Sequence, residues 1–162
     1  MSDLSHYRDD GAAHMVDVSA KDVTTRRATA RGVLRTRADV VAQIASGDLP
    51  KGEAIATARI AGIMGAKRTP DLVPLCHPLP ISGVEIDVTP ADDGSGTVEI
   101  SATVKTTGRT GVEMEALTAV TVAGLTLYDM IKAVDKAAVL TDIEVVAKSG
   151  GKSGDWTREE RA

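Results

Sequence analysis

The stretch Lys105–Lys136, KTTGRTGVEMEALTAVTVAGLTLYDMIKAVDK, decides the fold of this chain. It predicts one long helix, because Thr110 and Glu113 have the spacing of a capping box and small apolar residues follow almost without a break. Between Ala116 and Leu127 the only polar side chains are threonines. A helix without a hydrophilic face is expected to be buried on all sides.

Ionisable side chains stand at both ends of the predicted helix. Glu113 and Glu115 lie near its start, and Asp129 and Lys132 lie one turn apart at its exit. A straight helix separates Glu115 from Asp129 by roughly 21 Å, since each residue adds about 1.5 Å. Both can act on one small substrate only if the helix bends or if its two ends come from different subunits. The alternative is that the glutamates complement the helix dipole and that Asp129 and Lys132 form a surface pair.

Composition and charge narrow the class of protein. The 162 residues suit one domain, and 43% of them are hydrophobic although Phe is absent. Small apolar side chains bury little area each, so contacts between subunits are expected to supplement the core. A net charge of −4 disfavours general nucleic-acid binding. One cysteine, no signal-peptide pattern and no uninterrupted apolar run long enough for a bilayer predict a soluble, cytoplasmic protein without a membrane partner.

Strand and helix periodicities predict the other elements. Without a short helix at 38–45, the order is β-α-β-β-α-β, which is typical of the α+β ferredoxin-like fold, an antiparallel sheet with helices packed on one face. Both long helices are too apolar for a sheet that covers one side of each, so the protein is expected to be oligomeric. The expected organisation is a flexible N-terminal segment at 1–14 with strand-like alternation just after it at 15–18, one domain at 15–156, and a polar tail at 157–162. The expected strands are 28–35, 81–89, 97–106 and 140–147, and the second long helix is 53–68.

A stiff loop at Thr69–Pro80 holds four of the six prolines and presents Cys76 and His77. Cys76 is expected to be a packed thiol, and no metal site is predicted, because no second pair of metal ligands stands at a known spacing. For His77 two interpretations stay open. It is a ligand contact or acid–base group, or it is a loop residue with no part in chemistry.

The glycine-rich segment Lys148–Trp156, KSGGKSGDW, is similar to the end of a phosphate-binding loop. Val146 stands where a Walker motif needs glycine, so that motif is rejected. Backbone N–H groups at the end of a strand can still bind anions. The alternative is a flexible tail.

Cations gather at segment ends and in loops of this acidic protein, which favours a pocket for a polyanion such as a nucleoside triphosphate. Two other classes compete with an enzyme. A non-catalytic regulatory module that senses a nucleotide explains the cations but not the Asp129–Lys132 pair, and RNA recognition lacks the aromatic side chains on which bases stack. The cations are Lys21, Arg26, Lys51, Lys67, Lys132, Lys148 and Lys152.

Motif segments are spread over nearly the whole chain, namely Met15–Val18, Ala58–Met64, Pro74–Leu79, Val104–Leu117, Leu127–Met130, Lys132–Lys136 and Lys148–Trp156. In this order they resemble the molybdenum cofactor biosynthesis protein C family, the cyclic pyranopterin monophosphate synthases. The resemblance implies a ferredoxin-like lyase subunit in a homohexamer, a trimer of dimers with active sites between subunits. It also implies that cyclised dihydro-GTP is converted to cyclic pyranopterin monophosphate with loss of pyrophosphate, and that no cofactor is needed.

The resemblance further implies roles for individual residues. Asp129 matches the family's active-site carboxylate, and Lys132 matches its partner lysine. Lys132 is then a candidate general acid–base group whose pKa neighbouring cations would lower, and Asp129 would orient it or relay its proton. The implied substrate-binding residues are Leu75, Cys76 and His77 in one loop, Met114, Glu115 and the adjacent Glu113 in a second, and Lys51, Lys67, Arg26, Lys21 and Lys148 in a basic pocket.

Overall fold

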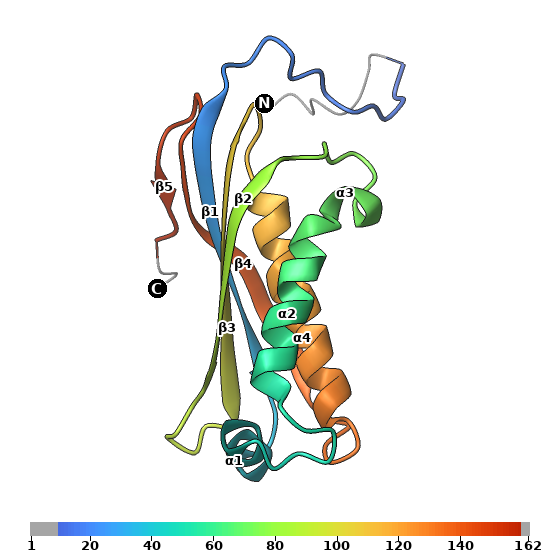
Figure 1. Ribbon diagram of the computed structural model, residues 1–162, viewed down its shortest axis with the longest axis vertical. Helices are drawn as coiled ribbons and strands as arrows, with labels where there is room; N and C mark the ends of the chain where they lie inside the picture. The colour runs from blue at the N-terminus through green and yellow to red at the C-terminus, as the bar shows by residue number, and fades with distance from the viewer. Residues whose placement is uncertain (1–9, 160–162) are drawn as a thin grey trace.

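An antiparallel sheet and two long helices form the two layers of the computed structural model (Figure 1). The structure describes residues 10–159, so most of the expected N-terminal segment, 1–9, and the end of the expected tail, 160–162, lie outside the described residues. The strand order in the sheet is β2-β3-β1-β4-β5. The strands are β1 (Thr24–Arg35), β2 (Ile81–Pro90), β3 (Thr97–Gly108), β4 (Val139–Ser149) and β5 (Trp156–Thr157), and the helices are α1 (Ala38–Ser46), α2 (Ala54–Lys67), α3 (Thr69–Leu72) and α4 (Glu113–Ile131).

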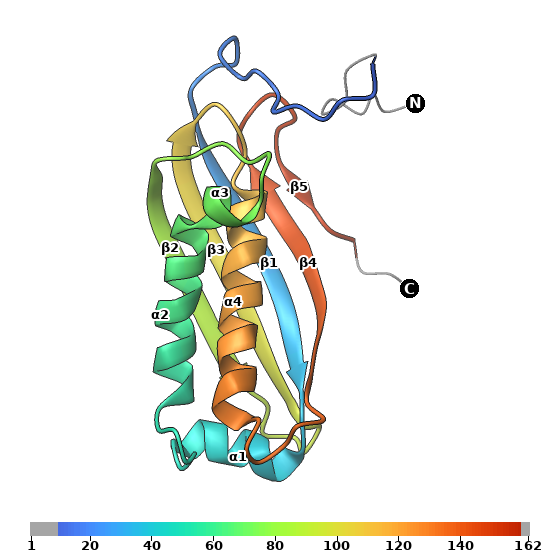
Figure 2. The same cartoon turned by 90° about the vertical axis from the view of Figure 1, so that its right-hand side faces the viewer.

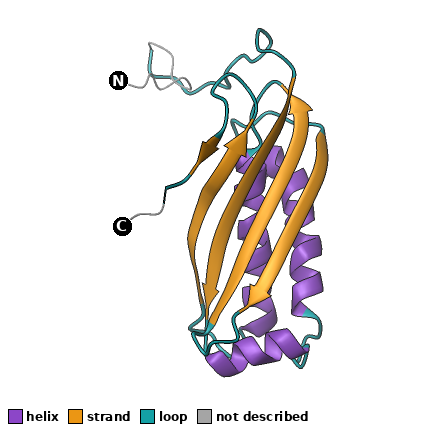
Figure 3. Ribbon diagram, turned by 90° about the vertical axis from the view of Figure 1, so that its left-hand side faces the viewer, coloured by secondary structure: helices purple, strands orange, loops and turns teal. Residues whose placement is uncertain are grey.

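The two long helices, α2 and α4, lie side by side on one face of the sheet, and α1 lies at one end of the two layers (Figure 2). Figure 3 shows the opposite face, where the strands are in view and the helices lie behind them. The central strands β1 and β3 pair in antiparallel register, from Thr24 opposite Gly108 to Arg35 opposite Thr97. The order of the elements and the placement of both long helices confirm the predicted ferredoxin-like fold.

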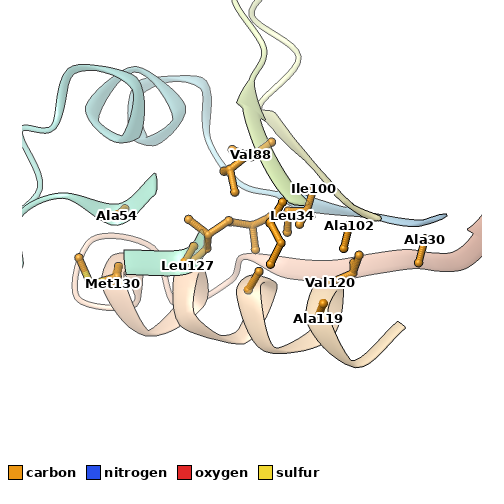
Figure 4. Packing of buried hydrophobic residues seen from close by; sticks show 14 of the residues in the cluster. Ala30, Leu34, Ala54, Val88, Ile100, Ala102, Ala119, Val120, Leu127 and Met130 are labelled. Atoms are coloured by element: carbon orange, nitrogen blue, oxygen red, sulfur yellow. The ribbon is translucent and has the colours of Figure 1, made fainter. Parts of the chain in front are cut away.

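The core lies between the sheet and the helices and is built from small and branched side chains. Ile100 and Ala102 of β3 are buried together with their alternate neighbours, because every second side chain of the strand faces the helices. Figure 4 shows these side chains together with Val120 and Leu127 of α4 in the core between the two layers. Gly32 of β1 permits α4 to approach the sheet closely, since a Cβ there would lie 2.8 Å from Val120 Cγ1.

Close packing of α2 on α4 depends on Gly62. A Cβ at this position would lie 2.9 Å from the backbone oxygen of Ala119 in α4. Gly62→Ala is therefore expected to lower the free energy of unfolding by about 1–3 kcal/mol, although alanine is the better helix former. Urea unfolding measures this change. Gly83→Ala is the control, because a Cβ there meets no atom closer than 4.0 Å. Equal losses in the two variants would contradict the packing role of Gly62.

The helix α4 is shorter than predicted at both ends. Residues 105–108 continue β3, and the helix begins only at Glu113, so the capping box from Thr110 is wrong. The strand extends because β1 begins at Thr24, earlier than predicted, and supplies a hydrogen-bonded ladder for these residues. Residues 132–136 form the turn that follows the helix.

One side of the helix layer stays uncovered. Leu125 of α4 is 62% exposed, and Ile60 and Met64 of α2 are 62% and 51% exposed. The expectation that the long helix is buried on all sides is therefore wrong for the single chain, because one sheet covers one side of a helix. By length and composition α4 is also the one described helix that could cross a membrane. Half of that stretch is buried inside the protein, and core helices pass the same test, so this is weak evidence for a membrane span.

Two short elements lie in segments that the sequence predicts as loops. The first, α3, lies at the start of the proline-rich loop, and the second, β5, pairs with Ala147 and Lys148 at the end of β4. Neither is long enough to show a helical or strand period in the sequence. The alternating residues 15–18 are in no strand of the sheet.

Candidate active site

Two lysines converge on one carboxylate at the C-terminal end of α4. Lys51 Nζ lies 2.8 Å from Asp129 Oδ2, and Lys132 Nζ lies 2.8 Å from Asp129 Oδ1. Asp129 and Lys132 come from successive turns, whereas Lys51 arrives from the connection between α1 and α2. All three side chains are about half exposed, so a ligand can reach them.

The pKa values in this cluster move in opposite directions. The hydrogen bond from Lys132, followed by the one from Lys51, lowers the pKa of Asp129 from 3.8 to about 2. The same hydrogen bond raises the pKa of Lys132. The predicted lowering of the Lys132 pKa by cations is therefore wrong for the single chain, because a carboxylate is its closest charged neighbour. Lys132 is an ammonium group at neutral pH, and it is suited to give a proton rather than to take one.

Asp129 is expected to stay ionised through the range in which carboxyl groups usually titrate. Because its pKa is lowered on folding, the stabilisation from its charge is complete above about pH 4 and is lost as the pH falls through about 2. NMR of the Asp129 carboxyl carbon measures the midpoint. Lys132→Ala is expected to raise that midpoint more than Lys51→Ala, since Lys132 is the larger cause of the shift. A midpoint near 3.8 in the unaltered protein would show that these ion pairs do not form in solution.

A small cavity of about 210 Å³ lies at the opposite end of α4. The proline-rich loop supplies Leu75, Cys76 and His77 to its wall, and the first turn of α4 supplies Met114 and Glu115. The structure thus brings together the two loops that the sequence assigns to substrate contact. Among residues 10–159, no three His, Cys, Asp or Glu side chains are grouped so as to hold a metal ion.

Glu115 is a buried carboxyl group with one unpaired oxygen. It is 2% exposed, and within the described part of the chain no hydrogen bond reaches its Oε2. Burial raises the pKa of Glu115, and burial followed by repulsion from Glu115 raises the pKa of the Cys76 thiol. A buried oxygen without a partner costs about 1–3 kcal/mol, so this side chain is suited to accept hydrogen bonds from N–H groups of a ligand.

A larger cavity of about 1100 Å³ adjoins the small one, and Lys21, Thr110 and Gly111 line both. Inside it, Lys148 Nζ lies 3.1 Å from Glu113 Oε1, which ties the end of β4 to the start of α4. Cations outnumber carboxylates in the lining, which favours an anionic ligand. The cations are Lys21, Arg26, Arg27, Lys148 and Lys152, and the carboxylates are Asp17, Asp22 and Glu113.

The glycine-rich segment forms one wall of the larger cavity. Gly150 and Gly151 have φ angles of 84° and 78°, in the left-handed region that favours glycine. A Cβ on Gly150 would also strike the backbone oxygen of Thr25, and a Cβ on Gly151 would strike the guanidinium of Arg26. This close contact with β1 puts Lys152 beside the cavity and favours anion binding over the alternative of a flexible tail.

The predicted site residues fall into two groups at opposite ends of α4. Because α4 is one continuous helix from Glu113 to Ile131, its ends cannot meet on a small molecule within one chain. Lys67 stands in the last turn of α2 and lines neither of the two cavities. One chain therefore carries two separate groups of candidate site residues, those that line the cavities and the Lys51–Asp129–Lys132 cluster.

Residues just before β1 also line the cavities, and Lys21 is the only one of them among the predicted site residues. Val16 and Val18 contribute to the small cavity, and Asp17 and Asp22 contribute to the larger one. Val16 and Val18 are half-buried while their neighbours are exposed. The strand-like alternation at 15–18 is therefore real, but it marks a cavity wall rather than a strand.

The fold and the two groups of side chains define a small α+β protein with a cavity lined mainly by cations. More specifically, the chain belongs to the MoaC family, whose model matches residues 15–151. It is 62% identical over 157 residues to a cyclic pyranopterin monophosphate synthase of Corynebacterium efficiens, covering 97% of this chain and 99% of that protein. It is 64% identical over 155 residues to the protein of that name in Streptomyces coelicolor, covering 96% and 89%. It is 62% identical over 156 residues to cyclic pyranopterin monophosphate synthase 2 of Mycobacterium bovis, covering 96% and 92%.

Proposed function

We propose that this chain catalyses the reaction for which its relatives are named, as a lyase of molybdenum cofactor biosynthesis. It converts (8S)-3′,8-cyclo-7,8-dihydroguanosine 5′-triphosphate to cyclic pyranopterin monophosphate and releases pyrophosphate. The observation that carries the proposal is the pair of adjoining cavities, one with a buried unpaired carboxyl oxygen and one lined by cations. Together they suit a ligand with N–H groups at one end and a triphosphate at the other.

The cavities would bind the two ends of the substrate differently. Glu115 accepts hydrogen bonds from the purine-derived ring, and His77 lies in the same wall. Lys21, which lines both cavities, and Lys148 face the triphosphate. Glu113 forms an ion pair with Lys148, and the phosphates would replace Glu113 as the partner of that lysine on binding. Leu75, Cys76 and Met114 shape the small cavity, and Arg26 extends the cationic wall.

The Lys51–Asp129–Lys132 cluster would supply the proton transfers. Opening the purine ring and closing the pyranopterin require protons on ring nitrogen and ribose-derived oxygen, and Lys132 gives them as a general acid. Asp129 orients Lys132 and holds its proton at neutral pH. In the phosphate step a substrate oxygen attacks the α-phosphorus, the bond to the bridging oxygen breaks, and pyrophosphate leaves with the electron pair. The cationic wall neutralises the charge on that leaving group.

A complete site would need a second copy of the chain. The exposed apolar side chains of α2 and α4, Ile60, Met64 and Leu125, supply surface for contacts between subunits. The proposed assembly is a homohexamer, a trimer of dimers, in which the cluster of one subunit meets the cavities of its neighbour. Lys67 would join the basic pocket only in that assembly. We further propose that residues 15–156 form one catalytic domain and that the protein works in the cytoplasm.

Incubation of the purified protein with the cyclised GTP tests the reaction. One pyrophosphate is expected for each cyclic pyranopterin monophosphate formed, and uncyclised GTP is the control that should yield neither product. Light scattering reports the mass of the assembly in the same sample. Binding of the cyclised GTP without release of pyrophosphate would make the protein a nucleotide- or pterin-binding module instead.

A further inference from the structure

The N-terminal arm, residues 15–22, forms the outer wall of both cavities. It belongs to no helix or strand, and it runs across the end of the two layers where α4 begins (Figures 1 and 2). Val16 and Val18 line the small cavity, Asp17 lines the larger one, and Lys21 lines both. A segment without a strand partner that closes a binding cavity must be held in place by side chains.

Within the described residues, two arginine side chains donate hydrogen bonds to the backbone of this arm. Arg109 Nη1 donates to the carbonyl oxygen of Ser19 at 2.5 Å, and Arg26 Nη2 donates to that of Asp22 at 3.5 Å. The arm is turned at this point, because Lys21 N donates to Val18 O at 3.0 Å. The Arg109 bond therefore ends on the apex of the turn that carries Lys21 into both cavities.

Arg26 also holds the backbone that carries Arg109 in place through two hydrogen bonds. Its Nε donates to Gly108 O at 3.0 Å, and its Nη2 donates to Arg109 O at 3.2 Å. Arg109 directly precedes Thr110 and Gly111, which line both cavities. The same short connection between β3 and α4 thus lines both cavities and holds the N-terminal arm. Arg109 itself lines neither cavity, which sets it apart from Arg26.

We propose that Arg109 is a positioning residue, which fastens the arm over the cavities and so sets how tightly the triphosphate substrate is held. The inference rests on the proposed function for the identity of the substrate, but the hydrogen bond that fastens the arm joins two residues of the protein itself. Arg109 acts through Ser19, Val18 and Lys21, with no contact of its own to the substrate. Removing its side chain opens the arm and leaves the Lys51–Asp129–Lys132 cluster unchanged.

Hydrogen exchange and steady-state kinetics of Arg109→Ala test this proposal. Backbone amides of residues 15–22 are expected to exchange faster in the ligand-free variant. KM is expected to rise about tenfold, because a hydrogen bond from a charged donor is lost, while kcat changes by less than about threefold. Arg109→Lys keeps a charged donor and should bring both the exchange rates and KM most of the way back to those of the unaltered protein. Arg35→Ala is the control, because Arg35 is an exposed arginine with one partner, Asp142, on the sheet.

A second substitution separates positioning from direct contact. Val18→Ala removes packing of the arm against the small cavity. If both residues act by holding the arm, KM of the double variant should rise by less than the product of the two single increases. A raised KM with unchanged exchange would overturn the proposal, because Arg109 would then bind the phosphates itself. Unchanged exchange and unchanged KM would overturn it as well. If the unaltered protein fails to release pyrophosphate, the proposed function falls, and the exchange of residues 15–22 still decides the role of Arg109.

Discussion

Lys132→Ala is expected to lower kcat by about 10²- to 10⁴-fold, the range for loss of a general acid. Lys132 is placed for this role because its Nζ lies 2.8 Å from Asp129 Oδ1 and the raised pKa keeps its proton on at neutral pH. The fold should survive, since the side chain is 52% exposed and a surface ion pair contributes little to stability. Pyrophosphate release measures kcat, and urea unfolding checks stability.

Two further variants sharpen this prediction. Lys136→Ala removes an exposed lysine four positions on and should leave kcat within about twofold, because a side chain outside the cluster takes no part in proton transfer. Lys132→Arg keeps the positive charge but cannot give up a proton at neutral pH. An inactive arginine variant supports proton donation, whereas near-normal turnover would mean that Lys132 acts only through its charge. Normal turnover in Lys132→Ala would end its catalytic role.

The sequence predicts the order of the elements because each has its own period. The alternation in β3 and the apolar run of α4 are local signals, and local signals decide which elements form. The boundary between these two elements is misplaced because residues 105–110, KTTGRT, suit a strand end and a helix cap equally well. The ladder to β1 decides it, and that partner lies about 80 residues earlier in the chain.

The candidate site is predictable in its residue types and less so in its geometry. The pair of Asp129 and Lys132 follows from helical spacing. The approach of Lys51 to Asp129 does not, because nothing in the sequence joins residues that are 78 positions apart. The direction of the Lys132 pKa depends on which charge lies closest, and that is set by this same packing. The hydrogen bond from Arg109 to the arm cannot be predicted from the sequence for a related reason. Its acceptor is the backbone carbonyl of Ser19, which any residue type at that position would supply.

Mixing two inactive variants is expected to restore activity, because each would be damaged at a different end of α4. Glu115→Gln removes the buried carboxylate of the cavity group, and Lys132→Ala removes the acid of the cluster. If each site takes its cavities from one subunit and its cluster from another, random reassembly at equal amounts leaves about one quarter of the sites intact. If one chain supplied both groups, every site would carry one defect and no activity would return.

The control for this experiment is a mixture of two variants damaged at the same end. Lys51 and Lys132 both bind Asp129 within one chain, so Lys51→Ala and Lys132→Ala each spoil the cluster of their own subunit. No arrangement of these chains contains an intact cluster, and their mixture should stay inactive after the same unfolding and reassembly. Recovery in the first mixture alone places the two halves of the site on different subunits. Recovery in neither, with assemblies of normal mass, would mean that α4 bends in solution and that each chain completes its own site.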